Sequence, residues 1–64
     1  MTKIRRGGYV FVTWIGDHAP LHVHVFRDGR LILKWNLEKN LPMEGRASAR
    51  LLALIRELRQ EGRL

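Results

Sequence analysis

The hydrophobic positions of this chain follow two different periods, which divide the sequence into a strand region and a helical region. Residues 9–15 are rich in aromatic and β-branched side chains and lie between glycine-containing pairs, a composition typical of a strand. Both faces of this segment are largely apolar, which favours a central or covered strand. Residues 22–25 alternate between histidine and valine, so two histidines share one face of a strand and two valines share the other. The first half of the chain therefore predicts a β-sheet.

The turn after the second predicted strand determines which way its side chains face. The dipeptide at 28–29 is Asp-Gly, which suits two kinds of hairpin turn. A two-residue type I′ turn would pair Phe26 with Leu31. A type I turn followed by a glycine bulge would instead pair Phe26 with Arg30.

Burial of one face is what sets strand register, and this favours the bulged turn. It predicts that His22 lies opposite Lys34 and that His24 lies opposite Ile32. It also gathers the apolar side chains of the two strands on a single face, namely Val23, Val25, Leu31, Leu33 and Trp35.

The last third of the chain predicts a helix. Its apolar side chains recur at i, i+4, i+7 and i+8, and Gly62 is a plausible stop. Residues 38–45 contain a proline and a glycine without a clear period, so we expect a loop there, and we expect the basic residues 1–7 to be frayed. The predicted fold is α+β, a three-stranded antiparallel sheet with one C-terminal α-helix packed on one face. The stripe that faces the sheet consists of Ala47, Leu51, Leu54, Ile55 and Leu58.

Length and composition restrict the class of protein. Sixty-four residues predict one domain spanning 1–64, with a core that is marginal for its surface. The absence of cysteine excludes disulfides and thiolate metal sites. No apolar run approaches the length of a membrane span, and no leader pattern is visible. The expected protein is soluble and cytoplasmic.

The charge balance predicts an anionic partner. Twelve Lys and Arg against six Asp and Glu give a formal net charge of +6, which attracts nucleic acid or an acidic protein. Most of these residues are arginine, whose planar fork suits phosphate and carboxylate groups, although a charged helix flank also serves solubility. No helix-turn-helix, zinc-finger or RNP signature indicates base-specific recognition. The candidate binding residues are Arg27, Arg30, Arg56, Arg59 and Arg63.

The three histidines allow three interpretations. His22 and His24 can be neutral imidazoles on a half-exposed structural or interface face, which needs no cofactor. Together with His18 or Asp17 from the preceding loop, they can supply three ligands of the kind that zinc accepts. Together with Lys34, they can act as catalytic acid and base in RNA cleavage, since one imidazole can remove a proton while the other donates one.

The histidine segment also resembles a known family. The pattern Asp-His-x-Pro-x-His-Val-His-Val at 17–25, with the flanking residues 8–11, 28–30 and 34–35, resembles domain-of-unknown-function family 4160, a family of small bacterial proteins. The resemblance covers nearly the whole chain. It implies a place in a two-gene, toxin–antitoxin-like module, and it implies no particular activity.

This chain departs from the family pattern at three positions. Prolines are usual in the family where this chain has Ala19 and Leu21, so its loop is less rigid. An aspartate is common where it has Asn36, which removes a carboxylate that could serve chemistry. The expected function is that of a small basic accessory protein engaging nucleic acid or an acidic protein partner. A small RNA-cleaving or metal-binding enzyme and a structural subunit are the alternatives.

An apolar patch predicts association. After the helix covers one face, the other still carries Phe26, Ile32 and one apolar row of the first strand. Contiguous apolar patches of this kind usually mark interaction sites. We therefore expect a homodimer, or a heterodimer with another protein.

Overall fold

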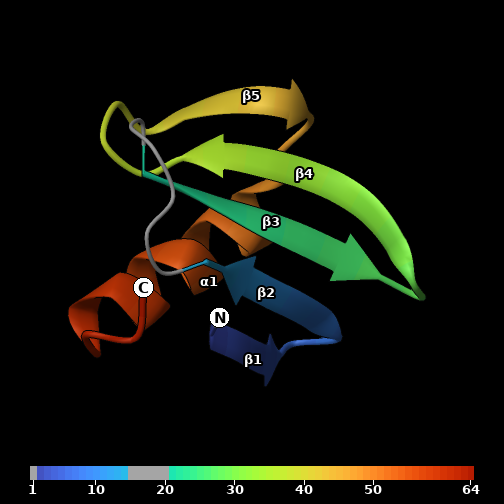
Figure 1. Ribbon diagram of the computed structural model, residues 1–64, viewed down its shortest axis with the longest axis horizontal. Coiled ribbons are helices and arrows are strands. Elements are labelled where there is room, and N and C mark those ends of the chain that lie inside the picture. Colours follow the sequence, from blue (N-terminus) through green and yellow to red (C-terminus); the bar gives the residue numbers. More distant parts are fainter. Residues whose placement is uncertain (1, 15–20) are drawn as a thin grey trace.

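A computed structural model describes residues 2–14 and 21–64, and it has five antiparallel strands followed by one C-terminal helix (Figure 1). The sheet order is β1-β2-β3-β4-β5, so each strand pairs with its neighbours in sequence. The prediction of a three-stranded sheet is therefore wrong, while the fold remains α+β. The elements are β1 (Thr2–Arg6), β2 (Tyr9–Thr13), β3 (His22–Arg27), β4 (Arg30–Asn36), β5 (Leu41–Gly45) and α1 (Ala49–Gln60).

The first additional strand, β1, comes from the segment that was expected to be frayed. Gly7 and Gly8 have φ of 62° and 85° and form a two-residue turn that pairs Arg6 with Tyr9. Such turns require positive φ at both central residues, which glycine adopts without steric cost. The chain therefore folds back at once, and β1 becomes an edge strand.

The second additional strand, β5, occupies the opposite edge in place of the expected loop. It pairs with β4, with Asn36 opposite Leu41 and Trp35 opposite Pro42. Proline is tolerated on an edge strand because one row of its backbone groups has no partner strand. All five residues of β5 are exposed, which explains why no hydrophobic pattern indicated a strand.

The turn between β3 and β4 is the two-residue one, contrary to the bulged turn that we predicted. Asp28 and Gly29 have φ of 52° and 76°, and Phe26 pairs with Leu31. The ladder then shifts between Val25 and Phe26 through a β-bulge. The irregularity therefore lies within the strands rather than in the turn.

This bulge gathers most of the apolar side chains of β3 and β4 on one face of the sheet, as the bulged turn was expected to do. Val25 pairs with Leu33 and Val23 with Trp35, so these four side chains share the apolar face. Leu31, however, is 42% exposed and does not join them. The predicted partners of the histidines are wrong by two positions: His24 lies opposite Lys34, and His22 lies opposite Asn36.

The helix packs on one face of the sheet, as predicted from its periodicity. Ser48 caps its N-terminus: the hydroxyl oxygen of Ser48 accepts a hydrogen bond from the Leu51 N–H. Its twelve residues bury Leu51, Ile55 and Leu58, and among the described residues no helix is long and apolar enough to cross a membrane. The sheet and Leu37, directly after β4, contribute the rest of the core. The strand residues are Ile4, Tyr9, Phe11, Val23, Val25, Leu33 and Trp35.

One face of the sheet is thus covered by α1, and we call the opposite face the open face. Figure 1 shows α1 behind the sheet, with the open face turned to the viewer. Phe11 of β2 is fully buried under the helix, whereas Trp14, directly after β2 and on the open face, is 38% exposed.

An ion-pair cluster connects β1 to the end of the helix. Arg6 Nη2 donates a hydrogen bond to Glu61 Oε1 at 3.0 Å, and Arg6 Nη1 lies 3.5 Å from Glu57 Oε1. The hydrogen bond from Arg6 holds the pKa of Glu61 below its usual value, and the same bond raises the pKa of Arg6. The cluster therefore stabilises the docking of the edge strand when Glu61 is ionised.

We expect Glu61→Gln to reduce the stability gained on raising the pH through the acidic range. A carboxylate whose folded-state pKa is lowered contributes its stability fully above its unfolded pKa, near 4.5, and loses it as the pH falls through the folded value. Urea unfolding at pH 7 and pH 3 checks this: the variant should be less stable than the wild type at pH 7, and the difference should be smaller at pH 3. Because the pair is exposed, 0.5 M NaCl should also reduce the difference at pH 7. An equal difference at both pH values would contradict the assignment.

Candidate nucleic-acid interface

The open face is built from alternate residues of adjacent strands, and the register aligns them in rows across the sheet. One row runs from Lys3 through Val12, His24 and Lys34 to Glu44. Residues in such a row have side chains close enough to interact directly. The row thus places an imidazole between a valine and a lysine, with basic and acidic side chains at its two ends.

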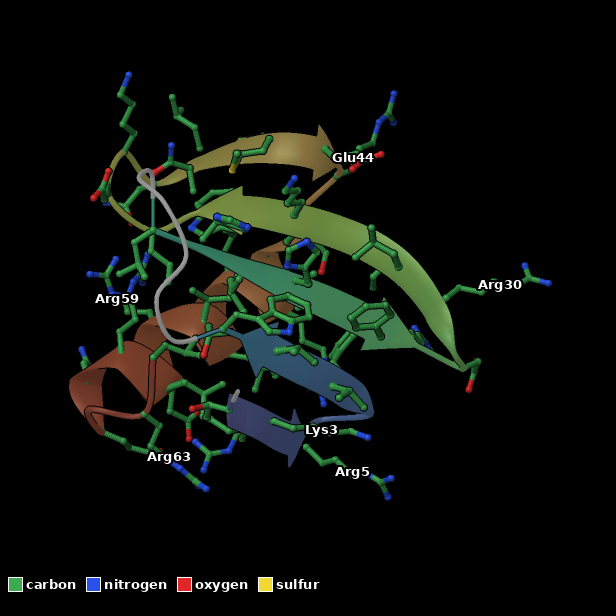
Figure 2. All side chains as sticks on the ribbon, in the orientation of Figure 1. Lys3, Arg5, Arg30, Glu44, Arg59 and Arg63 are labelled. Carbon is green, nitrogen blue, oxygen red and sulfur yellow. The ribbon has the colours of Figure 1, made fainter. Side chains whose placement is uncertain are left out.

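A second row lies beside the first, nearer the β3–β4 turn. It runs from Arg5 through Val10 and Phe26 to Leu31. Figure 2 shows Lys3 and Arg5 extending together from β1 at one edge of the sheet, and Glu44 at the other edge. The β1 edge of the open face is therefore cationic.

A shallow groove of about 450 Å³ follows these rows. Valine and aromatic side chains supply its apolar surface, and the two basic residues of β1 border it. Its lining residues are Lys3, Arg5, Val10, Val12, Trp14, Phe26 and Gly29. Apolar contact area with a cationic border is the combination that suits a ligand with flat rings and negative charge.

Three rings form a cluster beside this groove. The ring centroid of Trp14 lies 4.6 Å from that of His24, with the ring planes at 90°. The rings of His22 and His24 are 5.0 Å apart at 60°. These distances are those of edge-to-face aromatic pairs. The contacts hold the partly exposed Trp14 ring in place at the surface.

The three residues proposed for acid–base chemistry lie on this same face. His24 is directly opposite Lys34, and the ring contact places His22 beside His24. Both imidazoles are half-buried. The structure thus brings His22, His24 and Lys34 together, although Lys34 was expected opposite the other histidine.

Asn36, at the end of β4, has a structural role. It is buried, and its Oδ1 accepts hydrogen bonds from the backbone N–H groups of Glu38 and Lys39, both at 2.9 Å. Asparagine side chains commonly organise turns in this way. The residue fixes the turn that leads from β4 to β5.

The alternative zinc site cannot be assembled from the described residues. His18 and Asp17 lie outside them, so only His22 and His24 of the proposed ligands have a described position. Within residues 2–14 and 21–64, no group of three His, Cys, Asp or Glu side chains is placed to hold a metal ion.

The five arginines predicted to bind a partner are divided between two regions. Arg27 and Arg30 are opposite each other in the strand register at the β3–β4 turn. The Arg27 guanidinium lies over the Tyr9 ring, 5.6 Å from its centroid. Arg56, Arg59 and Arg63 belong to α1 and the residues after it. Figure 2 places Arg30 at the far end of the molecule from Arg59 and Arg63. The five therefore do not form one surface.

Two basic residues of the open face, Lys3 and Arg5, were missed because β1 was missed. A signal for them exists in the sequence. Lys3, Ile4 and Arg5 alternate, and Gly7-Gly8 follows directly, which is the pattern of a strand entering a two-residue hairpin. With β1 in place, Ile4 is buried under the helix and both basic side chains face the other way.

Comparison of the chain with protein-family models, with curated proteins and with solved structures finds no match in any of the three. Function is therefore inferred from the chemistry of the open face.

Proposed function

We propose that the open face binds single-stranded nucleic acid. The observation that carries this is the placement of an exposed Trp14 and the half-buried Phe26 on an uncovered sheet face, next to Lys3 and Arg5. Unpaired bases stack on aromatic rings whatever their sequence, and basic side chains alongside neutralise the phosphates. The open face offers both kinds of contact within one groove.

A single strand fits this surface better than a duplex. In a duplex the bases are stacked on each other and their faces are not available to protein rings. The rings that can stack on bases lie on the open face, whereas α1 packs its apolar stripe against the other face of the sheet. The protein therefore offers rings to bases rather than a helix to a groove.

The charges of the open face agree with an anionic ligand. Lys3, Arg5 and Lys34 outnumber Glu44, the acidic residue in the first row. The formal net charge of +6 would also draw the ligand to the protein from a distance. An acidic protein partner, as half of a two-gene module, would use the same charges but would not need the stacking of bases on rings.

The test is the affinity of the protein for a fluorescently labelled decauridylate, measured by anisotropy over a range of salt. With three to four phosphate contacts, the logarithm of the association constant should fall with the logarithm of salt at a slope of about −2 to −3. Trp14→Ala should weaken binding by about 5- to 150-fold, since one stacked base contributes about 1–3 kcal/mol, whereas Trp14→Phe should retain most of the affinity.

Three results would contradict the proposal: a flat salt dependence, equal affinity for duplex of the same length, or full affinity in Trp14→Ala. Sedimentation of the protein alone and with decauridylate completes the test. A homodimer formed through the open face should dissociate as the oligonucleotide occupies that face, because both occupants need the same side chains.

RNA cleavage is a second candidate function, favoured by the grouping of His22, His24 and Lys34 on the proposed binding face. One imidazole would take the proton of a ribose 2′-hydroxyl while the other protonates the leaving 5′-oxygen, and the lysine would offset phosphate charge. Incubation with labelled oligoribonucleotide should then give a 2′,3′-cyclic phosphate, and the oligodeoxyribonucleotide should stay intact. His22→Gln should abolish cleavage and retain binding. An intact oligoribonucleotide leaves the protein as a binder only.

A further inference from the structure

A second pocket, of about 610 Å³, lies on the helix side of the molecule, away from the open face. Its apolar lining comes from Trp35 of β4 and from Leu52 and Ile55 of α1. Its polar lining includes Arg56, Arg59 and Gln60. The volume falls within the range of about 300–1,000 Å³ that is usual for small-molecule sites.

The five helical residues of this lining form one continuous stripe. Positions 52, 55, 56, 59 and 60 are spaced i, i+3, i+4, i+7 and i+8, which places them on a single face of α1. The stripe is apolar toward the start of the helix and cationic toward its end. A ligand along it would therefore meet apolar side chains at one end and guanidinium groups at the other.

The guanidinium of Arg59 is held in position by the fold. Its Nη1 donates a hydrogen bond to the backbone carbonyl oxygen of Leu37, directly after β4. Figure 2 shows Arg59 extending from α1 toward this end of the sheet. The remaining N–H groups of a guanidinium anchored in this way are oriented before any ligand arrives.

No carboxylate of the described residues neutralises the pocket. The acidic residues of the helix end, Glu57 and Glu61, lie in ion pairs with Arg6, and Glu61 is also 4.0 Å from Arg63. Arg56 is exposed and has no ion pair within the described part of the chain. The two arginines of the pocket thus keep their charge available to a bound anion.

The apolar wall contains a polar group that also lacks a partner. Trp35 is 7% exposed, and its buried Nε1–H has no acceptor among the described residues. Unpaired buried donors are uncommon in folded proteins and usually point to a missing partner.

We propose that this pocket binds a small amphipathic organic anion. Its apolar body would contact Trp35, Leu52 and Ile55, and its oxyanion group, a carboxylate or a phosphate, would accept hydrogen bonds from Arg56 and Arg59. Arginine forks pair with both groups in a bidentate manner, so the shared chemistry is that of the oxyanion. This site is separate from the open face and does not depend on nucleic-acid binding.

The experiment follows the two indole N–H signals of ¹⁵N-labelled protein during titration with phenyl phosphate, phenylacetate, neutral phenylacetamide and inorganic phosphate. The Trp35 signal should shift and saturate at millimolar concentrations of at least one aromatic anion, while the Trp14 signal stays in place. The neutral amide and inorganic phosphate should each bind at least fivefold more weakly. The stronger of the two aromatic anions identifies the oxyanion that the pocket prefers.

Matched variants test the role of the arginines. Arg56→Gln should weaken binding of the preferred anion at least fivefold, whereas Arg63→Gln, an exposed arginine outside the pocket lining, should leave affinity unchanged. Thermal unfolding of both variants checks that they fold. The proposal is overturned if the Trp35 signal does not move up to 20 mM of either aromatic anion. It is also overturned if phenylacetamide binds as tightly, or if the two arginine variants lose affinity equally.

Discussion

Replacing Gly45 with alanine should be among the most destabilising single substitutions in this protein. Gly45 has φ of 83°, and an added Cβ would collide with the backbone carbonyl oxygen of Ile32 and lie 3.3 Å from Leu33 Cα. Both obstacles are main chain, so a side-chain rotation cannot relieve them. Positive φ costs about 1–2 kcal/mol, and overpacking adds about 1–3 kcal/mol, which together is a large part of the stability of a 64-residue domain.

Gly8 supplies a matched control for this substitution. Its φ of 85° is almost the same, but a Cβ added there meets nothing within 4 Å. Gly8→Ala should therefore cost only the backbone term, about 1–2 kcal/mol. Urea unfolding of the two variants measures the difference directly. Equal destabilisation would mean that β5 does not pack against β4 as closely as the structure shows.

Reversing the two charges of β1 should cause the largest loss of nucleic-acid binding. In Lys3→Glu/Arg5→Glu, two phosphate contacts are lost and two carboxylates repel the ligand. At about 0.5–1 kcal/mol for each of these four terms, the affinity for decauridylate should fall by about 30-fold or more. The slope of the salt dependence should become less steep by about 1 to 1.5.

The double variant Arg56→Glu/Arg63→Glu is the charge-matched control. It lowers the formal net charge of +6 by the same four units, but its substitutions lie on the helix side of the molecule. Long-range attraction should weaken equally in both proteins, so the excess loss in the β1 variant reports direct contact. If the helix variant loses more affinity, the ligand binds along the basic edge of α1 and the open face is not the site.

The helix was predictable because its signal is local. Leu51, Ile55 and Leu58 recur at helical spacing, Ser48 is a capping residue and Gly62 follows the end. Each of these features depends on residues a few positions apart. The structure confirms the helix and buries these three leucine and isoleucine side chains.

The faces of β3 and β4 were predicted through a wrong turn. Burial correctly placed Val23, Val25, Leu33 and Trp35 together, because only one face can be covered by the helix. Asp-Gly nevertheless formed its favoured two-residue turn, and the bulge near Phe26 reconciled turn and faces. The hydrophobic pattern of the two strands indicates that one of them contains a β-bulge. The position of the bulge depends on tertiary packing.

The two edge strands were missed for different reasons. β1 has alternating polar and apolar residues followed by a Gly-Gly turn, which indicates a strand. Its basic charge and its terminal position instead favoured the prediction of a frayed segment. β5 is exposed throughout and contains Pro42, so it has neither periodicity nor strand composition. Its pairing depends on the turn organised by Asn36 and on close approach at Gly45. These are features of the folded chain rather than of the segment.

The residues of the open face could be predicted only in part, because one of its strands, β1, was not predicted. The alternation at 22–25 correctly placed His22 and His24 on the face opposite the core valines. Lys3 and Arg5 could not be assigned to that face without β1. The arginines of the helix attracted attention because they are clustered in sequence, yet they lie on the other side of the molecule from Trp14.

The most direct test of the central claim is a ¹⁵N–¹H titration of the protein with decauridylate at low salt. Its readouts are the indole N–H signals together with the backbone amides of β1, β2, β3 and α1. Binding at the open face predicts that the Trp14 indole signal and the amides around Lys3, Val12 and Phe26 shift together, while the Trp35 indole and α1 amides stay in place. Shifts confined to α1, or none at all at millimolar oligonucleotide, would contradict the proposed interface.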